Sequence, residues 1–191
     1  YTSQSAIVAG QRAVNRYHEV VEAEGKARTV SYPIPGVVAF ATLTEGPGRA
    51  IFGESDRLTV VGGGHLFDVT AAGVVTDLGV LAVDGNPAQI ATSGDGGGEL
   101  AVVSGDEAYV LDLATNVLTH VASNATMVGH VDGFFLYLDA KTSTLKISES
   151  YDGLTMDPSQ FVQRSAASDR WKAMGIVAPE IYLLGEKTGE V

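Results

Sequence analysis

Short apolar runs separated by turn-forming residues constrain the fold of this chain more than any other feature. Residues 49–81 contain four such runs, each four or five residues long, at 49–52, 57–61, 65–69 and 74–78. Runs of this length are too short for isolated helices and are typical of β-strands. Glycine, serine and aspartate lie between them and favour tight reversals. The stretch therefore predicts a four-stranded antiparallel sheet.

This pattern repeats at intervals of roughly 40 residues, a period typical of propeller blades with four short strands each. The later predicted strands are 88–92, 99–103, 107–111 and 117–121, then 126–130, 134–138, 144–148 and 160–163, and finally 172–177 and 180–184. ELAVV at 99–103 aligns with RLTVV at 57–61, and a strand with a central aromatic residue follows each of them. A β-sandwich would have similar spacing. The recurring order of strand, turn and aromatic residue favours an all-β fold, a partial β-propeller of about three to four blades over residues 47–191.

Residues 1–46 lack this rhythm and are predicted to form an extended N-terminal leader. The sequence allows a short helix at 4–14, although Gly10 costs about 1 kcal/mol there relative to alanine. Residues 37–43 are strongly β-prone. We expect the leader to pack along the β-domain without a core of its own. Because the chain starts without methionine and ends within a predicted strand, we expect it to be part of a longer polypeptide.

Acidic residues are concentrated in the middle of the chain. The net charge is -11 at pH 7, and residues 51–140 carry twelve acidic side chains against a single basic one, Arg57. Tight nucleic-acid binding is not expected of such a surface, because that binding depends on Lys and Arg. Two interpretations stay open: a solubilising surface, or a surface that lets a polyanion pass without binding it. No apolar run approaches the roughly 20 residues of a membrane-spanning helix, so no membrane partner is expected.

The residues with chemical potential show no pattern typical of an active site. The chain has no cysteine, which excludes thiol catalysis and Cys-zinc sites. The histidines lack the spacing of metal ligands and are expected to have structural or surface roles: His18, His65, His120 and His130. Glycine runs at 62–64 and 94–98 match no phosphate-binding loop and predict turns. We therefore predict no catalytic, cofactor-binding or metal-binding residue, and a protein that is not an enzyme.

Several segments resemble the phage packaged-DNA stabilisation family, the tail accessory, hub or nozzle proteins of short-tailed phages. They are QRAVNRYHE at 11–19, Pro35-Gly36, SESYDGLT at 148–155, Phe161, SDRW at 168–171 and IYLLGEKTGEV at 181–191. His18 stands where that family usually has proline. The resemblance covers nearly the whole chain, and members of the family usually continue with several more β-units.

This resemblance implies a structural virion protein of the phage tail, assembled in the cytoplasm of a bacterial host. Copies would form a homo-oligomeric ring, a hexamer, below the portal, serving as a head-to-tail connector that extends the DNA channel and helps retain packaged DNA. The implied partners are the portal or adaptor and the tail needle or spike, and DNA would pass through without tight binding. Asp56, Asp68 and Asp77 are candidate channel-facing residues. The alternative is a glycan-binding propeller or another ligand-binding propeller scaffold, although the chain has only one tryptophan.

Overall fold

The computed structural model describes residues 16–23, 26–34, 36–54, 57–164 and 167–191. The helix predicted at 4–14 and the side chain of Asp56 lie outside these residues. The chain divides into two units, Tyr1–Phe40 and Ala41–Val191, whereas the sequence placed the end of the leader at residue 46. In the described ranges, no helix is long and apolar enough to cross a bilayer.

The first unit contains a β-hairpin of β1 (Arg16–Ala23) and β2 (Lys26–Pro33). Tyr17 lies opposite Tyr32, and their rings stack with centroids 5.4 Å apart. The strand predicted at 37–43 is wrong, because these residues pair with no strand of the described chain. β-propensity mainly reflects packing against neighbouring strands, and here no neighbour is present in the described chain.

The second unit is a partial β-propeller, as predicted, with three four-stranded antiparallel sheets and one three-stranded sheet. Blade 1 contains β3 (Gly48–Glu54), β4 (Arg57–Gly62), β5 (His65–Thr70) and β6 (Val75–Val80). Blade 2 contains β7 (Gln89–Thr92), a 3-10 turn (Gly94–Gly96), β8 (Glu99–Ser104), β9 (Glu107–Asp112) and β10 (Val117–Ser123). Blade 3 contains β11 (Met127–Val131), β12 (Phe134–Asp139), β13 (Thr144–Glu149) and β14 (Asp152–Gln163). Blade 4 contains β15 (Trp171–Val177), β16 (Glu180–Gly185) and β17 (Gly189–Glu190).

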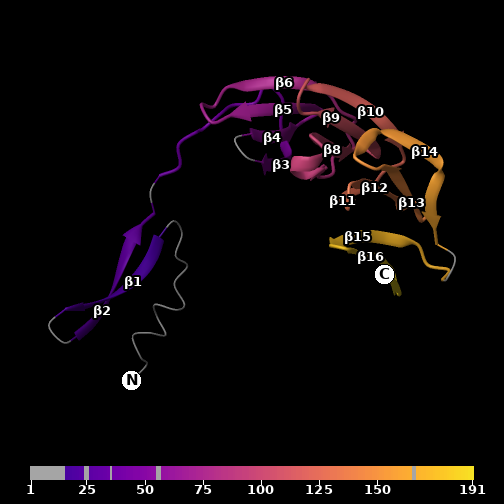
Figure 1. Cartoon of the computed structure of the whole chain (residues 1–191). Helices are drawn as coiled ribbons and strands as arrows, with labels where there is room; N and C mark the ends of the chain where they lie inside the picture. Colours follow the sequence, from indigo (N-terminus) through magenta and orange to yellow (C-terminus); the bar gives the residue numbers. More distant parts are fainter. Residues whose placement is uncertain (1–15, 24–25, 35, 55–56, 165–166) are drawn as a thin grey trace. The chain divides into compact units, whose positions relative to one another are not determined.

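The strands of each blade run outward in chain order. The first strands are neighbours along the inner side, since β3 contacts β7, and β11 contacts both β7 and β15 (Figure 1). The last strands are neighbours on the outer side, where β10 contacts both β6 and β14. This radial order is that of a propeller, so the sandwich alternative is wrong.

Each pair of neighbouring blades shares one apolar core, which we call a seam. Successive side chains of a strand point to opposite faces, so Leu100 and Val102 of β8 face blade 1 while Ala101 and Val103 face blade 3. Burial on both faces explains the unbroken apolar run ELAVV. The first seam is built from Val61, Leu66, Leu81, Ala88, Leu100, Val102 and Leu111; the second from Ala101, Val103, Ala108, Val110, Ala125, Phe135 and Tyr137; the third from Val131, Leu136, Leu138, Leu145, Trp171 and Leu183.

The β8–β9 turn shows why glycine is needed in the blade turns. Gly105 and Asp106 have φ values of 61° and 62°, the left-handed pair that matches the twist of a two-residue hairpin. A Cβ at Gly105 would lie 2.7 Å from the carbonyl carbon of Ala82. Glycine therefore allows both the turn and its close contact with the β6–β7 connection.

Candidate assembly surface

The histidines occupy structural positions, as the sequence predicted for His65, His120 and His130. His65 Nδ1 lies 2.8 Å from Asp77 Oδ2, and His120 Nε2 lies 2.6 Å from Glu107 Oε2. The ring of His130 packs 5.1 Å from that of Phe135, and burial lowers its pKa. His18 is exposed on β1. The described residues contain no group of three or more potential metal ligands.

The candidate channel-facing aspartates already have partners within blade 1. Asp68 on β5 forms an ion pair of 2.9 Å with Arg57 Nε, and Asp77 on β6 is the partner of His65. Arg57 also donates to the Leu113 carbonyl, at 3.3 Å, and so joins blade 1 to blade 2. Asp68 is therefore part of an internal link between blades rather than a free surface charge.

Arg49 on β3 is the main polar link of the first seam, and the sequence gave no signal of it. Its side chain is 6% exposed and forms a 3.0 Å ion pair with Asp84. It also donates to the Asn86 carbonyl at 2.8 Å, the Gly63 carbonyl at 3.1 Å and Ser104 Oγ at 2.8 Å. One side chain thus fastens the β4–β5 turn and the β6–β7 connection to blade 2.

The second seam leaves buried polar groups with fewer partners. Glu99 Oε2 accepts a 2.7 Å hydrogen bond from the Gly153 amide, and burial raises the pKa of Glu99, with nearby acidic residues adding to the shift. Tyr137 is fully buried, which raises the pKa of its hydroxyl. The hydroxyl of Tyr137 and Nε2 of His130 find no hydrogen-bond partner in the described chain.

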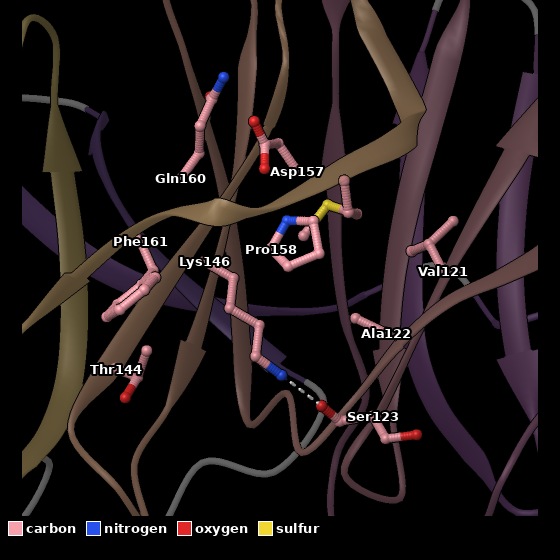
Figure 2. Close-up of a pocket in the computed structure, with 10 residues that line it drawn as sticks. Val121, Ala122, Ser123, Thr144, Lys146, Asp157, Pro158, Gln160 and Phe161 are labelled. Atoms are coloured by element: carbon pink, nitrogen blue, oxygen red, sulfur yellow. Dashed lines mark hydrogen bonds between the residues drawn. The ribbon is translucent and has the colours of Figure 1, made fainter.

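A groove of about 400 Å³ opens on the outer side of this seam, between β10, β13 and β14 (Figure 2). We call it the rim groove. Its apolar lining comes from Val121, Ala122, Met156, Pro158 and Phe161. Lys146 also lines it and donates a 2.7 Å hydrogen bond to the Ser123 carbonyl, which ties β13 to β10.

A bulge in β14 forms one wall of the rim groove. Lys146 of β13 faces Phe161, but Ser148, two residues later, faces Met156. Five steps along β14 therefore correspond to two along β13. The extra residues bend the outer strand and carry Pro158 over the groove (Figure 2).

Comparison with known proteins identifies the family. A family model described as bacteriophage P22 Gp10, β-propeller, matches residues 2–191. The chain belongs to this family. Its members are packaged-DNA stabilisation proteins, so this propeller is a phage structural protein and a component of the virion. A search of curated protein sequences found no match.

Several solved structures share the fold. PorZ of the type-IX secretion system of Porphyromonas gingivalis is similar with a TM-score of 0.54 and 18% identity, over 90% of this chain and 23% of PorZ. The N-terminal domain of Nup159 has a TM-score of 0.52 and 11% identity, over 81% of this chain and 40% of that domain. A chain of the S. cerevisiae complex of Dbp5, Nup159 and Gle1 has a TM-score of 0.53 and 12% identity, over 84% of this chain and 43% of that chain. The phage protein spans less than half the length of each of these chains.

Proposed function

We propose that this protein forms part of the tail hub of a short-tailed phage, as one of six copies in a ring below the portal. The observation that carries the proposal is the family match over residues 2–191. In this role the ring extends the DNA channel, helps retain the packaged genome, and contacts the portal or adaptor on one side and the tail needle or spike on the other.

The physical character of the chain supports a role in assembly. Its blades are joined by continuous apolar seams, and such close-packed interiors resist deformation. The net charge of -11 disfavours tight DNA binding. A wall of this kind constrains DNA by its shape and lets the genome leave when the plug opens.

Imaging of intact particles tests the location. Cryo-electron microscopy of the virion should show blades with the β3–β17 arrangement in a six-fold ring directly below the portal. Density for the protein at another position, or as an isolated monomer on the particle, would contradict the hub assignment.

A deletion tests the role in retaining DNA. Phage assembled without this protein should package the genome and then lose it, giving empty heads that can be counted by electron microscopy and DNA quantification. Supplying the wild-type chain in trans is the control and should restore filled heads. Unchanged DNA content without the protein would exclude a stabilising role.

A further inference from the structure

The segment before the first blade exposes apolar side chains that the described chain leaves uncovered. We call residues 16–40 the arm. Tyr17 and Tyr32 of its hairpin are 50% and 36% exposed, and Val37, Val38 and Phe40 are 99%, 86% and 59% exposed. A two-stranded hairpin is at best marginally stable alone in water. Monomers rarely expose so many neighbouring apolar residues, so the arm requires a partner surface.

The rim groove offers an apolar surface beside an open strand edge. β14 is the last strand of its sheet, and no described strand hydrogen-bonds to its outer edge. Phe161 and Val162 on this strand are 50% and 48% exposed. Such edges readily pair with another extended segment. Residues 37–40 have no strand partner of their own in the described chain, and their side chains have the same apolar character as the groove lining.

Chain length directs the arm toward another copy. Leu43 lies on blade 1, where a Cβ added to Gly62 would be 2.8 Å from its Cδ1 atom. Phe40 lies three residues earlier, and three residues span at most about 10 Å. The rim groove lies about one and a half blade spacings farther along, or about 15 Å, and two strand spacings outward, or about 10 Å. Phe40 therefore cannot reach the groove of its own chain.

The charge distribution favours the same contact. Residues 51–140 carry twelve acidic and one basic side chain, so copies that met through these parts would repel each other. Residues 1–50 carry five basic and four acidic side chains, and residues 141–191, which supply β13 and β14, carry six and seven. Contact between the arm and blade 3 brings together the two nearly neutral parts of the chain.

We propose that the arm of one copy docks in the rim groove of a second copy. Residues 37–40 lie along the outer edge of β14, and Phe40 contacts the apolar lining formed by Met156, Pro158 and Phe161. The inference rests on the proposed ring and names the contact that links its copies. Because the arm and the groove are different surfaces, the interface is head-to-tail, and such an interface closes into a ring when each copy gives one arm and receives another.

Disulfide trapping tests the contact directly, since the chain has no cysteine. In the double variant V38C/V162C, mild oxidation should give a ladder of covalent multimers on a non-reducing gel, with peptides linked between positions 38 and 162 identified by mass spectrometry. V38C/V80C is the matched control, because Val80 lies on the outer strand β6 and is 69% exposed. It should give no link between positions 38 and 80.

The trapped species decide the proposal. A link between positions 38 and 162 within one chain would show docking in the same copy and overturn the exchange between copies. Absence of this link, or equal trapping in V38C/V80C, would remove the rim groove as the docking site.

Self-association of Phe40 variants separates this proposal from the proposed ring. Phe40→Ser should weaken self-association measured by light scattering about 10- to 100-fold, because a buried apolar anchor is lost. Val80→Ser, the control, should leave it unchanged. Normal multimers of Phe40→Ser would overturn arm docking and leave the ring intact. A wild-type chain that stays monomeric over the whole concentration range would contradict both.

Discussion

The first and second seams join neighbouring blades in the same way but differ in how they treat buried polar groups. In the first seam, Arg49 is nearly buried and meets a carboxylate, a hydroxyl and several carbonyl groups. In the second seam, the Tyr137 hydroxyl and His130 Nε2 have no partner in the described chain. A buried polar atom without a partner costs about 1–3 kcal/mol. The second seam is therefore less well satisfied, and the rim groove lies on its outer side.

The two seams also differ in the shape of their side chains. Leucines and valines from both blades fill the first seam. In the second seam, small residues of blade 2 such as Ala101 and Ala108 face the large rings of Phe135 and Tyr137 from blade 3. The comparison shows that one blade architecture can be held by polar links in one place and by shape complementarity in another.

The largest expected effect is on the first seam. Arg49→Ala should lower the free energy of unfolding by about 3–5 kcal/mol, because Asp84 and several carbonyl groups lose their common donor. Urea denaturation followed by circular dichroism measures the change. Arg170→Ala, at an exposed arginine, is the control and should shift stability by less than about 0.5 kcal/mol. Similar values for both variants would mean that Arg49 does not hold the seam.

A smaller effect should break the shape fit of the second seam. A Cβ at Gly153 would lie 2.8 Å from both the Glu99 carboxylate and the Phe135 ring, so Gly153→Ala should cost about 1–3 kcal/mol through overpacking. Gly175→Ala is the matched control, since no heavy atom lies within 4 Å of its Cβ position. Thermal unfolding should show a lower melting temperature only for Gly153→Ala. Equal melting temperatures for the two variants would remove close packing at Gly153 as a determinant of the seam.

Two buried tyrosines compare the polar groups of the seams directly. Tyr109 accepts a 3.0 Å hydrogen bond from the Ala82 amide in the first seam, so Tyr109→Phe should cost about 1 kcal/mol. Tyr137→Phe removes a hydroxyl without a partner and should leave stability unchanged or raise it. Parallel urea titrations of the two variants measure the difference. A loss at Tyr137 as large as that at Tyr109 would reveal a partner for its hydroxyl.

The smallest effect concerns pH. Burial raises the pKa of Glu99 above its ordinary value of 4.5, so the folded state favours the neutral acid. The stability from this group is full below pH 4.5 and is lost as pH rises through the raised pKa. Glu99→Gln stays neutral and should gain stability relative to the wild type as pH rises from about 4 to about 7. Urea titrations across this range check the trend.

A control of opposite sign is available on β9. The hydrogen bond with His120 lowers the pKa of Glu107. Its contribution to stability is therefore present above its ordinary value of 4.5 and is lost as pH falls through the lowered pKa. Glu107→Gln should lose stability relative to the wild type as pH rises from about 3 to about 5. The same trend in both variants would contradict the assigned environment of Glu99.

Most blade strands could be predicted from sequence because each apolar run is bounded by residues that favour turns. ELAVV, for example, lies between Gly98 and Gly105 and forms β8 with one additional residue. β14 was harder, since Tyr151-Asp152-Gly153 resembles the turn that precedes a strand, while Pro158 lies in a bulge that no local pattern reveals. The short β17 was not predicted at all.

The polar links could not be predicted because they depend on register and on contacts between blades. His65 and Asp77 are twelve residues apart and meet across the β5–β6 hairpin. The partners of Arg49 lie as far away as Ser104, 55 residues along the chain. Only the packed arrangement of the blades brings these groups together.

The bulge of β14 has a consequence for how such proteins can change during evolution. It accommodates extra residues in an outer strand, while β11, β12 and β13 keep their regular pairing. Insertions and deletions at this position would reshape the rim without altering the spacing of the inner strands. Related proteins can therefore acquire different surface partners through changes in chain length at one outer strand, while the blade framework stays constant.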